Sequence, residues 1–150
     1  MKKTTISLML LLLVAGCSHK TESNGVTGTP PPDVAVKESA AQKSAEEWLA
    51  LVDAGNYAES WKNAAGLFQT AVAQDQWEHT IAGVRKPLGD VVSRKLKSAQ
   101  YAKSLPGAPD GEYVVLQFNT SFVNKKAAVE TVTPKFDSDG NWKVSGYYIN

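Results

Sequence analysis

The spacing of apolar residues divides the chain into an apolar leader, a polar segment, a helix-forming half and a strand-forming half. In the leader, an apolar run from Ile6 to Ala15 follows Lys2 and Lys3, and polar residues begin immediately after Cys17. The run is shorter than the ~20 apolar residues that a membrane-spanning helix needs. This pattern is typical of a secretory signal peptide, which is removed from the mature protein.

The end of the leader, Val14, Ala15, Gly16 and Cys17, resembles the bacterial lipobox, in which the cysteine is acylated and becomes the new N-terminus. Cys17 is the only cysteine of the chain, so no disulfide explains it. The alternative is an ordinary signal peptide cut near Gly16. We predict a signal peptide over residues 1–16 and a membrane anchor at Cys17, because several acyl chains attach a protein stably. An aspartate directly after the acylated cysteine resembles a signal that retains a lipoprotein in the inner membrane. This chain has Ser18 at that position, so we expect it in the outer membrane, facing the periplasm.

Residues 18–32 are polar and contain Gly25, Gly28 and three consecutive prolines. Such a composition buries too little apolar surface to fold. We therefore predict that residues 17–32 form the acylated cysteine and a flexible tether, and that a single domain occupies residues 33–150. His19 lies in this tether, and we interpret it as a solvated residue rather than a metal ligand.

A helix is predicted over residues 33–54, which contain no proline or glycine. Apolar residues recur there at spacings of three and four, which indicates one buried face. Gly55 follows where a glycine commonly ends a helix. The residues of the predicted face are Ala41, Ala45, Trp48, Leu49 and Val52.

Two further helices are predicted before the pattern changes. A short helix carries Tyr57 and Trp61, and a longer third helix runs from about Gly66 to Arg85. Pro87 and Gly89 end the third helix. Its apolar stripe comprises Ala73, Trp77, Ile81 and Val84.

The second half alternates apolar and polar residues, which predicts strands over residues 91–102, 112–123, 127–136 and 142–150. The segments between them are rich in glycine, proline, asparagine and aspartate, so short turns join consecutive strands. Such connections imply an antiparallel meander. The predicted fold class is α+β, with three N-terminal helices packed on one face of a curved four-stranded antiparallel sheet.

The charge of the chain argues against nucleic acid as a partner. Loss of Lys2 and Lys3 with the leader changes the formal net charge from +1 to −1, and the remaining basic residues form no run. Two distant histidines and one cysteine make no metal site. We find no P-loop, nucleophile elbow or dinucleotide-binding glycine pattern, so we expect no cofactor.

The segment from about Ala45 to Ile149 contains a set of residues that are specific when taken together: Trp48, Leu49, Asp53, Gly55, Tyr57, Ser60, Trp61, Trp77, Arg85, Lys86, Pro87, Leu88, Gly89, Arg94, Pro109, Asp110, Gly111, Tyr113, Phe118, Phe122, Lys125, Glu130, Val132, Asp139, Gly140, Trp142, Gly146, Tyr147, Tyr148 and Ile149. In these residues the segment resembles the bacterial domain-of-unknown-function family 4019, found in small exported proteins and lipoproteins. The resemblance implies a fold similar to the nuclear-transport-factor-two-like cone, in which helices cover a bent sheet and leave a pocket at the open end. It implies no known reaction and no catalytic set.

Two charged residues share faces with apolar residues of the predicted strands. Alternation places Arg94 on the face of Val92, Leu96 and Ser98, and it places Glu130 on the apolar face of its own strand. Because an unpaired buried charge is costly, we expect Arg94 and Glu130 to meet. Two interpretations stay open. The pair holds strands in register, or Glu130 lines a pocket as an acid, a base or a ligand contact while Arg94 orients it or binds an anion.

Four other side chains are weaker candidates. Arg85 falls at the end of the predicted third helix, where a cation stabilises the helix dipole, with ligand binding as the alternative. His79 fits a polar helix face better than a general base. We interpret the tryptophans mainly as core residues, with a stacking pocket that includes Trp61 and Trp77 as the alternative.

Two function classes follow from these observations. The leading hypothesis is a non-enzymatic, lipid-anchored envelope protein whose domain binds a protein partner or a small ligand. The alternative is a cone-pocket enzyme in which Glu130 is the general acid or base and Arg94 assists it. A solvent-accessible Glu130 favours the enzyme, whereas a Glu130 held against Arg94 favours a structural role.

Overall fold

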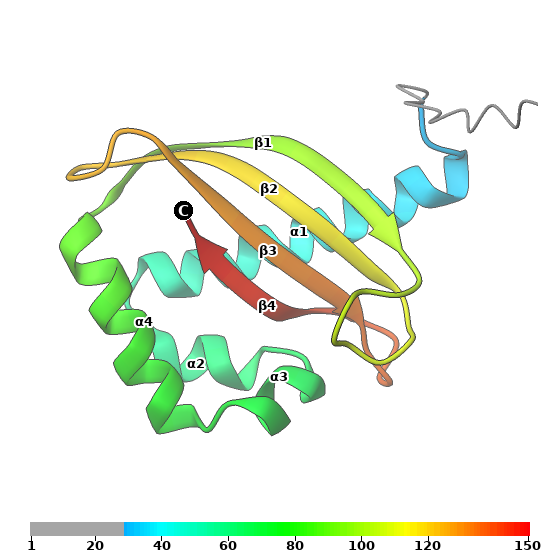
Figure 1. Cartoon of the computed structure of the whole chain (residues 1–150), viewed down its shortest axis with the longest axis horizontal. Coiled ribbons are helices and arrows are strands. Elements are labelled where there is room, and N and C mark those ends of the chain that lie inside the picture. The colour runs from blue at the N-terminus through cyan, green and yellow to red at the C-terminus, as the bar shows by residue number, and fades with distance from the viewer. Residues whose placement is uncertain (1–28) are drawn as a thin grey trace, which may run out of the picture.

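A computed structural model of the chain describes residues 29–150 (Figure 1). The predicted signal peptide, the predicted acylation site at Cys17 and the predicted tether up to residue 28 lie outside the described residues. The elements are α1 (Pro32–Asp53), α2 (Tyr57–Lys62), α3 (Gly66–Ala71), α4 (Gln74–Leu88), β1 (Val91–Ala102), β2 (Tyr113–Phe122), β3 (Ala128–Phe136) and β4 (Trp142–Ile149). Among the described residues, no helix has both the length and the apolar character to cross a bilayer.

The helix α1 forms as the apolar spacing predicts, and it buries the five residues of the predicted face. It ends at Asp53, and two residues later Gly55 has a φ of 75°, which suits a residue without a side chain. The amide of Gly55 donates to the carbonyl of Val52, and the amide of Asn56 donates to the carbonyl of Leu51. These two bonds satisfy carbonyl groups that the helix end would otherwise leave unpaired.

The predicted third helix is wrong in one respect, because the structure divides it into α3 and α4. Val72 and Ala73 are extended at the break, with φ and ψ of −133° and 121° for Val72. The freed carbonyl of Val72 accepts a hydrogen bond of 2.8 Å from the indole of Trp61. Neither residue is a proline or a glycine, so the sequence carries no local signal of the break. Pro87 also lies within the last turn of α4 rather than after it.

The sheet is a four-stranded antiparallel meander in the order β1-β2-β3-β4, which confirms the α+β prediction. The helix α1 runs across one face and contacts all four strands, while α2 and α4 pack on each other (Figure 1). Alternate residues of β2 and β3 are buried beneath the helices. We call this the inner face and the opposite one the outer face.

The strand β1 departs from simple alternation because its pairing with β2 shifts twice, between Val91 and Ser93 and between Leu96 and Ser98. After the second shift Ser98 pairs with Gln117, so Ser98 does not share the face of Arg94 as the sequence predicts. An extra residue in one strand causes such a change of face. Arg94 lies between the two shifts and stays on the inner face.

Aromatic and aliphatic side chains from α1, α4 and the inner face form the core. The rings of Trp48 and Trp77 lie 5.7 Å apart, and Tyr147 of β4 lies 5.4 Å from Trp48. The hydroxyl of Ser60 accepts the indole N–H of Trp77 at 2.9 Å. The aromatic groups therefore connect the helices to the edge strand β4 beside the charged residues described next.

Candidate functional site

Glu130 is the buried centre of the candidate site. It lies on the inner face of β3, opposite Phe118 of β2 and Ile149 of β4, and its side chain is 0% exposed. The regular alternation of β3 positions it there, because the residues on either side point to the outer face. A carboxylate in such a place needs donors from the protein itself.

Side chains from four elements supply those donors. Oε2 accepts hydrogen bonds from Arg94 Nε at 2.6 Å and from Thr120 Oγ1 at 2.5 Å. Oε1 accepts from the Tyr147 hydroxyl at 2.5 Å, from Arg94 Nη2 at 3.2 Å and from Arg85 Nη1 at 3.4 Å. Both carboxylate oxygens are thus fully engaged, and every donor is a protein side chain.

Asp53, the last residue of α1, is the second carboxylate of the site. It accepts from Arg85 Nη2 at 2.7 Å and from Arg94 Nη1 and Nη2 at 2.7 and 3.0 Å. The side chain of Asp53 is 27% exposed, whereas Arg94 and Arg85 are 15% and 5% exposed. Two arginines and two carboxylates therefore balance their charges here. We call these four residues together with Thr120 and Tyr147 the charged cluster.

The charged cluster changes the acidity of its members. Burial alone would raise the pKa of Asp53, but the hydrogen bonds and positive charges of Arg94 and Arg85 outweigh it and lower that pKa. Burial raises the pKa of Tyr147, and the adjacent carboxylate of Glu130 raises it further. Tyr147 is therefore held as a neutral hydrogen-bond donor, and Asp53 is held as an anion.

Cavities reach the charged cluster at Asp53, Arg85 and Thr120. Four cavities of between about 330 and 790 Å³ open on the described residues, and Glu130 lines none of them. Asp53 and Arg85 line one of about 330 Å³, together with Tyr57, Lys86 and Asp90. Arg85 Nε is buried there without a hydrogen-bond partner in the described structure. Partners of Glu130, and not Glu130 itself, line two of these cavities.

The structure brings Arg94 and Glu130 together, as the strand alternation predicts. Arg85 does not serve mainly to end its helix, because it points inward to both carboxylates and packs 4.8 Å over the ring of Phe122. His79 is exposed on α4.

Trp61 and Trp77 line none of the four cavities. Trp77 is 6% exposed, and the indoles of both residues donate within the domain, to Val72 and Ser60. The stacking alternative therefore finds no support at these two residues. Trp48 and Trp142 do line a cavity, of about 790 Å³, between α1 and the turn that joins β3 to β4.

Sequence reasoning missed Asp53, Thr120 and Tyr147 as partners of Glu130. Asp53 and Tyr147 are among the residues that carry the family resemblance, so the resemblance already marked both of them. It did not indicate that they contact the same group. Thr120 gave only the signal of a hydroxyl on an apolar strand face. Within residues 29–150, no group of three His, Cys, Asp or Glu side chains is arranged to hold a metal ion.

Comparison with known proteins gives one family. The family model described as "Protein of unknown function (DUF4019)" matches residues 44–147, which include all six members of the charged cluster. No curated protein and no solved structure matches the chain.

Proposed function

Because the chain belongs to the DUF4019 family of proteins of unknown function, we propose a function from its own residues. The protein is an exported, lipid-anchored envelope protein, and its α+β domain is a non-enzymatic binding module for a protein partner or a small ligand. The lipobox-like residues up to Cys17 support the export and the anchor. The polar segment that follows supports a tether that holds the domain away from the membrane surface.

The burial and the hydrogen bonding of Glu130 favour a binding role over catalysis. This carboxylate is 0% exposed and accepts five hydrogen bonds from Arg85, Arg94, Thr120 and Tyr147. A general acid or base must reach the proton that it transfers, either directly or through one water. Glu130 lines none of the four cavities described above. The alternative enzyme, with Glu130 as acid or base assisted by Arg94, would require the charged cluster to open.

The anchor is tested by comparing the full chain with a Cys17→Ser variant in a bacterial host. The unaltered chain should sediment with the outer membrane and carry the added mass of acyl chains at Cys17. Ser18→Ala is the matched control, because it changes the neighbouring residue but keeps the thiol. If Cys17→Ser is exported, correctly cleaved and still firmly attached to the membrane, the lipid anchor is refuted.

The binding role is tested by native mass spectrometry of the gently purified, exported chain. Excess mass that disappears on denaturation supports a ligand-binding module. A bare mass together with no crosslinked partner in the intact membrane would contradict the proposal. A Glu130-dependent chemical turnover of any co-purified small molecule would favour the enzyme instead.

A further inference from the structure

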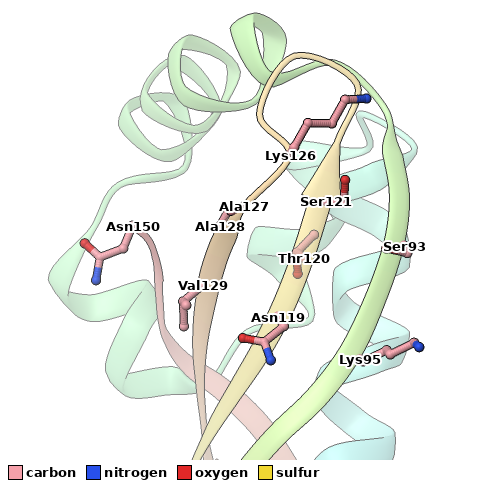
Figure 2. Close-up of a pocket in the computed structure, with 10 residues that line it drawn as sticks. All are labelled: Ser93, Lys95, Asn119, Thr120, Ser121, Lys126, Ala127, Ala128, Val129 and Asn150. Carbon is pink, nitrogen blue, oxygen red and sulfur yellow. The ribbon is translucent and has the colours of Figure 1, made fainter.

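The outer face of the sheet carries a cavity of about 460 Å³, lined by both polar and apolar residues, at the end where β1 begins (Figure 2). Ser93 and Lys95 of β1 and Asn119 and Ser121 of β2 line it. These residues alternate with Arg94 and Thr120, whose side chains join the charged cluster on the inner face. The cavity therefore lies directly behind the buried charges.

The strand register places the lining residues in continuous rows. Lys95 pairs with Asn119, and Asn119 pairs with Val129 of β3. The backbone of Val129 exchanges hydrogen bonds of 3.2 and 3.0 Å with Asn150, which follows β4. One row thus crosses β1, β2 and β3 and ends at Asn150 just after β4, and the pair of Ser93 with Ser121 lies beside it. We call these residues together with Lys126 the outer row.

The charged side chains of the outer row are both lysines. Lys95 and Lys126 contribute two ammonium groups, and no aspartate or glutamate side chain lines the cavity. Neither lysine forms an ion pair within residues 29–150. Both are exposed, and Figure 2 shows Lys126 at the upper end of the cavity and Lys95 at its β1 side. An anionic ligand in this cavity would meet positively charged side chains and no competing aspartate or glutamate.

The remaining groups are suited to a hydroxylated ligand. Serine hydroxyls and asparagine amides both donate and accept hydrogen bonds, as sugar hydroxyls do. A volume of about 460 Å³ falls within the range of small-ligand sites, roughly 300–1,000 Å³, and exceeds what a bare inorganic anion fills. We propose that the outer row binds an acidic saccharide, with its carboxylate or phosphate at Lys95 and Lys126 and its hydroxyls at Ser93, Asn119 and Ser121. This inference rests on the proposed binding function and specifies the class of its ligand.

The charged cluster gives this site a fixed shape. Arg94 of β1, Thr120 of β2 and Tyr147 of β4 all bond to Glu130 of β3, so each of the four strands is connected to the others on the inner face. A site whose groups are held in place before binding loses less entropy when the ligand arrives. The buried charges thereby support recognition on the opposite face without contacting the ligand.

The test is isothermal titration of the full chain, purified in a non-ionic detergent, with defined probes. Trigalacturonic acid and glucose 6-phosphate present the anionic group on a sugar, while a neutral galactose trimer and inorganic phosphate each present only one of the two features. Anionic vesicles provide the lipid-surface comparison. We expect at least one anionic sugar to bind about 10-fold more tightly than the neutral trimer and than inorganic phosphate, with an affinity that falls as salt rises.

Variants locate the site. Lys95→Gln and Lys126→Gln should together weaken binding by about 10-fold, because each removes one charge-assisted contact. Asn119→Val should weaken it by roughly 3- to 5-fold through lost hydrogen bonds. Lys97→Gln is the matched control, since it removes an equal charge from the same strand at a residue that does not line the cavity.

Several results would overturn the inference. Equal binding of inorganic phosphate and sugar phosphate would indicate a simple anion site, and binding to anionic vesicles alone would indicate a lipid surface. No effect of the two lysine substitutions would place the ligand elsewhere. The test of the lipid anchor uses Cys17→Ser and membrane fractionation. Failure of saccharide binding therefore leaves the outcome of the anchor test unchanged. A different molecule retained in the native mass would likewise support the binding role while refuting the acidic saccharide.

Discussion

Substitution of Glu130 by glutamine is the sharpest test of the charged cluster. The change keeps the size of the side chain but removes one negative charge. It also replaces one acceptor oxygen with an amide NH₂ group, which can only donate hydrogen bonds. Whichever oxygen is replaced, at least two donors lose their partner, because Oε2 serves Arg94 and Thr120 while Oε1 serves Tyr147 and both arginines. The site would then hold two arginines and one carboxylate.

The magnitude follows from the burial of these groups. The side chains of Arg85 and Arg94 are 5% and 15% exposed. Water can therefore replace few of the hydrogen bonds that they donate to Glu130. Removing one partner of a buried ion pair costs about 3–5 kcal/mol. The free energy of unfolding of a small domain is about 5–15 kcal/mol in total. We therefore expect Glu130→Gln to remove a large share of the stability and to leave a domain that is folded only marginally.

Urea unfolding followed by tryptophan fluorescence measures this directly, because Trp48 packs 5.4 Å from Tyr147 of the cluster. At a slope of about 1–3 kcal/mol per molar urea, the midpoint should fall by at least about 1 M. Glu46→Gln is the matched control. Glu46 is exposed on α1 and accepts one bond from Gln42, so its loss should change stability by less than about 0.5 kcal/mol.

A charge-balanced double variant separates electrostatics from packing. Arg94→Gln with Glu130→Gln leaves Arg85 opposite Asp53, and the net charge of the site returns to zero. The double variant should lose less stability than the sum of the two single variants, by about 0.5–3 kcal/mol. Additive losses, or a Glu130→Gln variant within about 1 kcal/mol of the unaltered chain, would refute our account of the site.

Two other predictions concern pH and backbone conformation. The arginines lower the pKa of Asp53, so the stability that its charge contributes is present above its unfolded pKa of about 3.9 and is lost as the pH falls through the lower folded value. Urea midpoints of Asp53→Asn and of the unaltered chain should therefore converge below about pH 4, and a constant difference from pH 3 to 7 would contradict this. Gly89 has a φ of 72°, and an added Cβ would lie 3.1 Å from a neighbouring side-chain carbon, so Gly89→Ala should lower stability by about 1–3 kcal/mol. Gly83→Ala is its control in calorimetry, because Gly83 lies within α4 with open space around it and alanine there should add about 0.5–1 kcal/mol.

The fold was predictable to the extent that periodicity and turn residues determine it. The four strands lie within one or two residues of their predicted ends, because each is bounded by turn formers. The division between α3 and α4 was not predictable, since the extended Val72 and Ala73 are stabilised by a tertiary bond from Trp61. The change of face at Ser98 was hidden for a similar reason, because a shift in pairing leaves no signature in a single strand.

The site was only partly predictable. The alternation of β1 and β3 was sufficient to pair Arg94 with Glu130, because two opposite buried charges on the same face of one sheet need each other. It was not sufficient to place Arg85, whose position near a helix end had an adequate local explanation. Asp53 occupies the end of α1, and only the crossing of that helix over the sheet brings it to Arg94. Contacts of this kind depend on how elements pack, which periodicity does not describe.

The charged cluster also explains how the sheet maintains its register. Arg94, Thr120, Glu130 and Tyr147 come from four different strands and meet only in the observed pairing. A slip of one residue in any strand would turn its member to the outer face and leave the others as unpaired buried groups. Since the same slip would remove Lys95 or Asn119 from the outer row, we infer that the inner charges preserve the outer site. Faster amide exchange of Lys95 and Asn119 in Glu130→Gln than in Glu46→Gln would support this coupling, and equal exchange would refute it.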